Sequence, residues 1–102
     1  MSLLSAVKRD SITIMADILR ALANGRSSKK MSVVYKANLN FDRIGKYLDL
    51  LIATGHVEIV TSDQGRDSYR ITARGRDFLS QFDRLVESLR NADQHEMIEA
   101  PV

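Results

Sequence analysis

The sequence contains no cysteine, few aromatic residues and no long apolar segment. Without cysteine, disulfide bonds and thiolate metal sites are excluded, and this composition suits an intracellular protein. An aromatic content of 6% is low for a protein that binds single-stranded nucleic acid by base stacking. No apolar run reaches the ~18 residues that a membrane helix needs, and residues 1–10 lack the apolar core of a secretory signal. We therefore expect a soluble, cytoplasmic protein with no membrane partner.

Signals of catalysis and of metal binding are also missing. The chain has no glycine-rich phosphate loop and no nucleophile elbow. Its 2 histidines, His56 and His95, lie far from each other and from any set of residues with metal-ligand spacing. The carboxylates are scattered and stand near basic residues. We expect no enzymatic activity, no metal site and no cofactor, and the sequence indicates no small-molecule ligand.

The charge of the chain is unevenly distributed, although 102 residues fit a single domain with a modest core. Residues 1–76 contain 13 Lys and Arg against 7 Asp and Glu, a net charge of +6. Residues 77–102 contain 2 against 6, a net charge of −4. This division predicts a basic body that meets an anionic partner and an acidic C-terminal element kept away from it. Ordinary surface charge is the alternative interpretation.

A first helix is predicted from Asp10 or Ser11, either of which can cap it, to about Asn24. Gly25 is well placed to end this helix in the left-handed conformation. Its apolar residues recur at helical spacing and are Met15, Ile18, Leu19 and Leu22.

A short helix is predicted next, over residues 31–37, and either Ser27 or Ser28 can cap it. Asn38 tolerates the left-handed conformation, so Asn38 and Leu39 predict a tight turn in which Leu39 is buried. The apolar positions of the short helix are Val33, Val34 and Ala37, with Tyr35 at the edge of that face.

The helix over residues 41–53 has the clearest pattern in the chain. Asn40 can cap it by accepting from the backbone N–H of residue 42 or 43, and Gly55 can stop it. Its core face comprises Ile44, Leu48, Leu51 and Ile52, with Phe41 and Tyr47 beside it. Its opposite face carries Asp42, Lys46, Asp49 and Ala53.

A hairpin and a last helix complete the chain. Residues 56–61 and 68–71 are rich in β-branched side chains, and the turn-forming residues 62–67 between them predict a short wing. Thr72 can cap the last helix, whose apolar stripe continues to Ala92. One apolar stripe of this helix is heptad-like and consists of Phe78, Phe82, Leu85 and Leu89, while Leu79 and Val86 lie on a second edge.

The order α-α-α-β-β-α predicts an α+β fold, mostly α, of the winged helix-turn-helix type with an extended C-terminal helix. Residues 1–76 would form the DNA-binding part. Residues 77–102 would form a dimerisation helix and acidic tail within the same compact unit. Two apolar edges on one helix exceed what so short a chain can cover, so we expect a homodimer. The predicted dimer interface comprises Phe78, Phe82, Leu85, Val86 and Leu89.

Several short motifs together resemble the small archaeal winged-helix DNA-binding proteins. They are Tyr35-Lys36-Ala37-Asn38-Leu39-Asn40-Phe41, Lys46-Tyr47-Leu48, Gly55, Tyr69-x-Ile71-Thr72-x-x-Gly75 and Phe78-Leu79. The resemblance covers roughly residues 12–90. It implies a winged helix whose long C-terminal helix pairs with its twofold mate as an antiparallel coiled coil. It also implies a transcriptional regulator or chromatin protein that binds double-stranded DNA. Met31, Asn40 and Phe41 depart from the threonine, serine and tyrosine usual in that family.

In a helix-turn-helix, the first turns of the second helix face the base edges of the major groove. This rule nominates Asn40, Asp42, Arg43 and Lys46. Arg43 is the strongest of them, because a guanidinium can bind guanine through two hydrogen bonds. Lys46 has an alternative interpretation, since it is spaced for surface ion pairs with Asp42 and Asp49. Phosphate contacts are expected from Lys29, Lys30, Lys36 and the wing residue Arg66.

Two further interpretations stay open at this stage. One is a winged helix that serves as a protein–protein adaptor, and the other is a nonspecific chromatin protein. Our first expectation is a dimeric regulator on double-stranded DNA, associated with the nucleoid. Its recognition helix, residues 41–53, would lie in the major groove and its wing, residues 62–67, would lie on the backbone.

Overall fold

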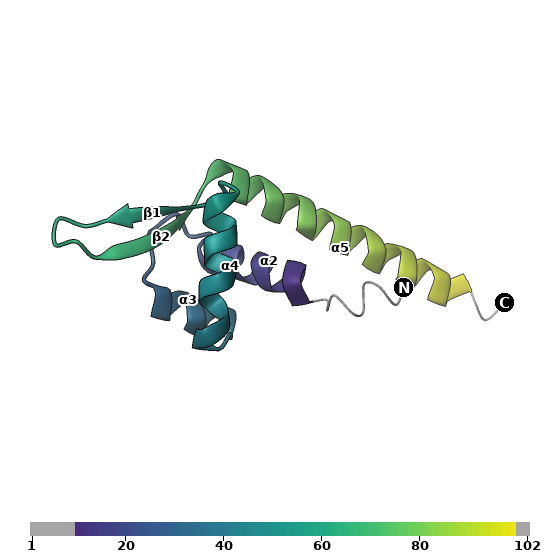
Figure 1. Cartoon of the computed structure of the whole chain (residues 1–102). Coiled ribbons are helices and arrows are strands. Elements are labelled where there is room, and N and C mark those ends of the chain that lie inside the picture. Colours follow the sequence, from purple (N-terminus) through teal and green to yellow (C-terminus); the bar gives the residue numbers. More distant parts are fainter. Residues whose placement is uncertain (1–9, 100–102) are drawn as a thin grey trace.

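The computed structural model describes the backbone of residues 10–99 and the side chains of residues 11–92. The elements in chain order are α2 (Asp10–Ala21), α3 (Lys30–Ala37), α4 (Phe41–Ala53), β1 (Val57–Thr61), β2 (Asp67–Ile71) and α5 (Ala73–Glu99). Helices α2, α3 and α4 pack together, the β-hairpin projects to one side, and α5 runs away from the hairpin over α2 (Figure 1). Within the described part, none of the helices has the length and apolar character needed to cross a membrane.

Helix α2 lies at the centre of the core. Its residues Ile18 and Leu19, and Leu22 directly after it, have no exposed surface. Met15, predicted on this face, is only partly buried, whereas Ile14 is 7% exposed and fully part of the core. The helix ends earlier than predicted, because residues 22–24 form a turn before Gly25 at φ +85°.

Helix α4 has the predicted bounds, and local contacts fix both of its ends. The Asn40 side chain accepts a hydrogen bond of 3.1 Å from the Arg43 backbone N–H. At the other end, Gly55 adopts φ +82°, and its N–H donates to the Ile52 carbonyl over 3.0 Å. The His56 N–H reaches back to the Leu51 carbonyl over 2.8 Å. These two bonds form a Schellman motif, which satisfies carbonyls that a helix end otherwise leaves unpaired.

The prediction that a serine caps the second helix is wrong. Helix α3 begins at Lys30, one residue early, and its N-cap residue Lys29 makes no side-chain cap bond. Ser28 instead pairs with Tyr69 of β2, through two backbone hydrogen bonds of 2.8 Å, and is 9% exposed. The backbone of residue 28 therefore forms an isolated bridge to β2, and this pairing takes Ser28 away from the helix end. Asn38, after α3, has the predicted left-handed conformation at φ 56°.

The hairpin pairs Val57 with Ile71 and Thr61 with Asp67, so each strand differs from its predicted bounds by one residue. Ser62 organises the connection between the strands, because its hydroxyl accepts from the backbone N–H groups of Gln64 and Arg66 at 3.3 and 3.2 Å. The wing is therefore an ordered turn.

Helix α5 is fixed to the body by its first turns. Thr72 donates to the Gly55 carbonyl over 2.6 Å and accepts from the Gly75 N–H over 3.1 Å, which confirms it as the cap. Further along, Arg20 of α2 pairs with both carboxylate oxygens of Asp83 at 3.1 and 3.0 Å. The helix continues to Glu99, beyond the predicted end of its apolar stripe at Ala92. Polar residues there weaken the apolar pattern without breaking the helix, since none is a strong helix breaker. The side chains of residues 93–102, His95 among them, lie outside the described ones.

Candidate nucleic-acid interface

Helix α4 has one buried side and one exposed polar side. Ile44 and Leu48 are at most 1% exposed and hold the helix against α2 and α3. The four residues predicted to face base edges, Asn40, Asp42, Arg43 and Lys46, are all exposed. Because the opposite side of α4 is packed in the core, its polar side has a fixed orientation. Phe41, expected beside the core face, is 51% exposed at the start of the helix.

Arg43 stands near the phenol of Tyr47. The pKa of Tyr47 is lowered, chiefly by a hydrogen bond with Ser11, and further by a hydrogen bond with Arg43 and by the positive charges of Arg43 and Lys46. Tyr47 itself is 6% exposed. The buried Tyr47 ring therefore gives Arg43 a fixed neighbour on α4. Arg43 is the residue that we predict to contact the edge of a DNA base.

Lys46 does not form the surface ion pairs of its alternative interpretation. Among the described side chains, no salt bridge joins Lys46 to Asp42 or Asp49. Its ammonium instead lies 5.6 Å from the centroid of the Tyr47 ring. This arrangement leaves the charge of Lys46 on the exposed side of α4, together with that of Arg43.

The three lysines predicted to contact phosphate lie on α3 or just before it. Lys29 and Lys36 are exposed, while Lys30 is partly buried. The Lys30 ammonium lies 5.0 Å from the centroid of the Phe41 ring, so Lys30 spans from α3 to the start of α4. Seven of the eight predicted residues thus lie on α3 or α4 or directly before one of these helices. Arg66 is apart from them, in the turn at the end of the hairpin (Figure 1).

Two exposed side chains of α3 were not predicted as site residues. Tyr35 is 87% exposed and Met31, one turn earlier, is 60% exposed. Their spacing of four places them on one side of the helix. The signal was present in the helical pattern, since both positions lie off the buried face made by Val33, Val34 and Ala37.

The predicted dimer interface divides into two parts. Phe78 and Phe82 are partly buried against the core, and their rings are stacked with centroids 6.5 Å apart. Leu85 and Leu89 are 59% and 62% exposed, and Val86 is partly buried. A groove of about 390 Å³ joins the two parts and is lined by Ile12, Phe78, Gln81, Phe82 and Leu85. Ile12 was not predicted here, although it lies three residues before Met15 on the apolar side of α2.

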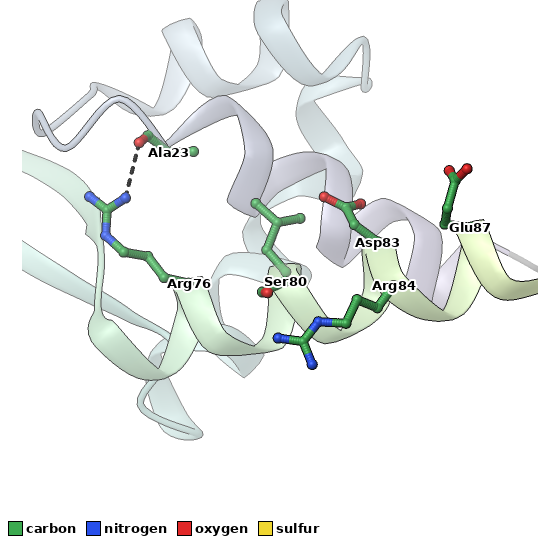
Figure 2. Close-up of a pocket in the computed structure, with 7 residues that line it drawn as sticks. Ala23, Arg76, Ser80, Asp83, Arg84 and Glu87 are labelled. Carbon is green, nitrogen blue, oxygen red and sulfur yellow. Dashed lines mark hydrogen bonds between the residues drawn. The ribbon is translucent and has the colours of Figure 1, made fainter.

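A second, shallow groove of about 580 Å³ follows α5 and is lined by Ala23, Arg76, Leu79, Ser80, Asp83, Arg84 and Glu87. Figure 2 shows Arg76 at one end of this groove, where its guanidinium donates to the Ala23 carbonyl, in the turn after α2, over 3.2 Å. Charges of both signs line this groove, and Arg76 and Asp83 already bind α2. We therefore regard it as part of the α2–α5 contact.

Within the described part of the chain, no three His, Cys, Asp or Glu residues are grouped so that they could hold a metal ion. His56 lies at the junction of α4, β1 and α5. Its ring contacts Phe78 edge-on, with centroids 5.5 Å apart, and its Nδ1 lies 2.7 Å from the Thr54 hydroxyl. The pKa of His56 is lowered by burial and, to a lesser degree, by the charge of Arg74.

A short helix, a tight turn and a second helix with one exposed polar side, packed beside a hairpin, are the arrangement of winged helix-turn-helix proteins. The family comparison agrees. The chain belongs to the winged helix-turn-helix family, whose model matches residues 8–90.

Among solved structures, the chain is similar to Sso10a-2, a DNA-binding protein from Sulfolobus solfataricus. The two share 27% identity over 88% of this chain and 92% of that one, with a TM-score of 0.74. The transcriptional regulator BldR from the same organism shares 18% identity over 94% and 80% of the two chains, with a TM-score of 0.69. A MarR-family transcriptional regulator from Silicibacter pomeroyi shares 23% identity over 84% of this chain and only 56% of that one, with a TM-score of 0.63. The last two show the fold alone. No curated protein matches the chain.

Proposed function

We propose that the protein binds double-stranded DNA as a homodimeric transcriptional regulator, with the first two turns of α4 in the major groove. The observation that carries this proposal is the exposed polar side of α4, where Arg43 and Lys46 stand on a helix whose other side is buried. The 27% identity with a protein described as DNA-binding supports it. The charge balance supports it too, since residues 1–76 have a net charge of +6.

In this proposal the residues have separate roles. Arg43 reads a base edge, Lys46 and Asn40 lie beside it in the groove, and Asp42 opposes binding at unsuitable positions by charge repulsion. The lysines Lys29, Lys30 and Lys36 and the wing residue Arg66 contact phosphates, which supply affinity and register. Binding, and no chemical step, is the activity that we assign to this surface.

The dimer is proposed through the exposed half of α5. Among the described side chains of α5, Leu85 and Leu89 are the large apolar ones with the greatest exposure, and they continue the groove that begins at Ile12. Large exposed apolar surfaces on soluble proteins commonly mark association sites. We propose an antiparallel coiled coil between two copies of α5, and an intracellular location beside the DNA.

Fluorescence anisotropy with a random DNA duplex tests the function. We expect binding at low salt that weakens steeply as salt rises, because bound lysines release counterions from the DNA. On a selected binding site, Arg43→Ala should weaken binding by about 1–3 kcal/mol and relax one base position, whereas Lys36→Ala should weaken all sequences alike. Arg90→Ala, which removes an exposed charge on α5, is the matched control and should change little. Equal, sequence-blind losses from Arg43→Ala and Lys36→Ala would exclude base reading by Arg43.

Sedimentation tests the dimer. Leu85→Glu should yield a folded monomer, because it places a charge in the centre of the proposed interface. Ile59→Glu makes the same change at a hairpin position that is 46% exposed, and it should leave the dimer intact. A dimer mass that Leu85→Glu does not alter would contradict the coiled coil.

The second candidate function is a protein–protein adaptor, which the exposed Met31 and Tyr35 on α3 favour. Apolar and aromatic side chains are typical of protein interfaces. Indifference to duplex DNA at low salt would put this function first.

A further inference from the structure

Lys30 is held against the recognition helix in a way that the other predicted phosphate-binding lysines are not. Its ammonium lies over the Phe41 ring at 5.0 Å from the ring centroid, within the ~6 Å that a cation–π interaction requires. Lys29, its neighbour in the sequence, is exposed, whereas Lys30 is partly buried. Phe41 is 51% exposed, so only part of its ring is covered by the protein.

Gly45, one turn after Phe41, lies on the same side of α4 and also faces the Lys30 side chain. A Cβ at this position would lie 3.4 Å from the Lys30 ammonium and 4.0 Å from its Cε. The end of the Lys30 side chain therefore lies across α4, over the bare backbone of Gly45 and against the Phe41 ring. We call this arrangement the Lys30 seat.

A glycine inside a helix lowers helix stability, so its presence here calls for a reason. Gly45 has no positive φ, and the Lys30 atoms are the only described neighbours within 4 Å of its missing Cβ. Lys30 is thus the described side chain that passes nearest to the missing Cβ of Gly45, at van der Waals distance from it.

The seat leaves the ammonium able to bind an anion. A cation–π contact removes no charge, and an ammonium has three donors. Among the described side chains, Lys30 forms no salt bridge. A free lysine side chain loses conformational freedom when it binds, and the seat reduces that loss before DNA arrives.

We propose that Phe41 is a positioning residue for DNA binding. Its ring, together with the bare backbone at Gly45, holds the Lys30 ammonium beside the first turns of α4, where it binds a phosphate of the DNA backbone at the edge of the groove that α4 enters. This inference rests on the proposed function. It adds that one phosphate contact is fixed to the recognition helix itself, so that Lys30 sets the register of α4 and Lys29 does not.

A mutant cycle on a random DNA duplex over a range of salt concentrations tests this inference. Phe41→Leu keeps an apolar side chain and every charge, and should weaken binding about two- to fivefold, the equivalent of an exposed cation–π interaction. Phe41→Tyr keeps the ring and should bind like the wild type. Lys30→Ala should also reduce the slope of log K against log salt by about 1.

The decisive measurement is the coupling between the two positions. Phe41→Leu should have no further effect in a Lys30→Ala background, but its full effect in a Lys29→Ala background. An effect of Phe41→Leu that persists without Lys30 overturns the inference, because the ring would then act on its own. Thermal unfolding of each variant shows whether the fold is intact.

NMR of the free protein separates this inference from the proposed function. The Lys30 Hε protons should be shifted upfield by the Phe41 ring, and Phe41→Leu should abolish the shift. If the Lys30 Hε protons are unshifted although the protein binds DNA, the Lys30 seat is refuted and the proposed function is not. A wild type that shows the shift but does not bind duplex DNA at low salt would overturn both the proposed function and the role of the seat in it.

Discussion

Replacing Gly75 by alanine should destabilise the fold, although alanine is the better helix former. Gly75 lies in the first turn of α5, where this helix crosses the start of the hairpin. A Cβ there would lie 2.3 Å from the His56 carbonyl oxygen and 2.7 Å from Cγ1 of Ile71. The first of these neighbours is backbone, held by a hydrogen bond of 3.1 Å from the Thr72 N–H, so it cannot simply turn away. Helix α5 would have to move outward.

The size of the effect follows from opposing contributions. Overpacking typically costs about 1–3 kcal/mol. An outward shift also strains the bonds from Thr72 to Gly55 and His56, each of which contributes about 0.5–1.5 kcal/mol. Helix propensity returns about 1 kcal/mol in favour of alanine. We expect a net loss of about 2–4 kcal/mol in the free energy of unfolding, or on the order of 10–20 °C in Tm for a chain of this size.

Gly45→Ala is the matched control, because it makes the same substitution inside α4. The nearest described atom to its Cβ would be the Lys30 ammonium at 3.4 Å, an ordinary van der Waals distance, so the gain in helix propensity should prevail. Urea unfolding at one protein concentration, followed by circular dichroism, should therefore show Gly45→Ala more stable by about 0.5–1 kcal/mol and Gly75→Ala less stable than the wild type. A Gly75→Ala variant as stable as the wild type would refute the close approach of α5 to His56.

Two further predictions concern charge. Asp83→Asn should lower stability by about 0.2–1 kcal/mol, because it removes a half-exposed pair with Arg20. Arg20 lowers the pKa of Asp83 below 3.8, so this contribution is present above pH 3.8 and is lost as the pH falls through the lowered pKa. Thermal unfolding from pH 6 to pH 2 should thus show wild type and variant converging at the acid end. For His56, burial and then Arg74 lower the pKa below 6.5, so the unfolded chain binds the proton more tightly. Stability should fall as the pH drops below 6.5, and His56→Gln should flatten that slope in urea unfolding at pH 7.5 and 5.5.

The parts of the fold that local chemistry determines were predictable from the sequence. Helix α4 has the expected bounds, because Asn40 and Gly55 act on backbone groups only three or four residues away. Asn38 and Thr72 likewise adopt their predicted conformation and cap, since a left-handed residue and a side-chain cap need no distant partner.

Features that depend on distant contacts were not predictable. Ser28 had the right chemistry for a helix cap, but Tyr69, far along the chain, offered a strand pairing instead. The contact between Lys30 and Phe41 depends on the angle between α3 and α4, which the sequence pattern does not encode. The burial of Phe78 but not of Leu85 depends on where α2 stops covering α5. For the candidate site, the sequence identified the exposed charged residues, and their roles in binding DNA remain predictions.

The junction between α5 and the rest of the body has a further consequence for the proposed dimer. Arg76 donates to the end of α2, Arg74 donates to the Thr54 carbonyl at the end of α4, and Asp83 pairs with Arg20. All of these contacts precede the exposed residues Leu85 and Leu89, through which two copies would meet. In the proposed dimer, this junction would then set the distance and angle between the two α4 helices. Dimeric helix-turn-helix proteins match the spacing of DNA half-sites by such geometry. The first two turns of α4 would determine which bases are bound within each half-site. The junction would determine the spacing between two half-sites.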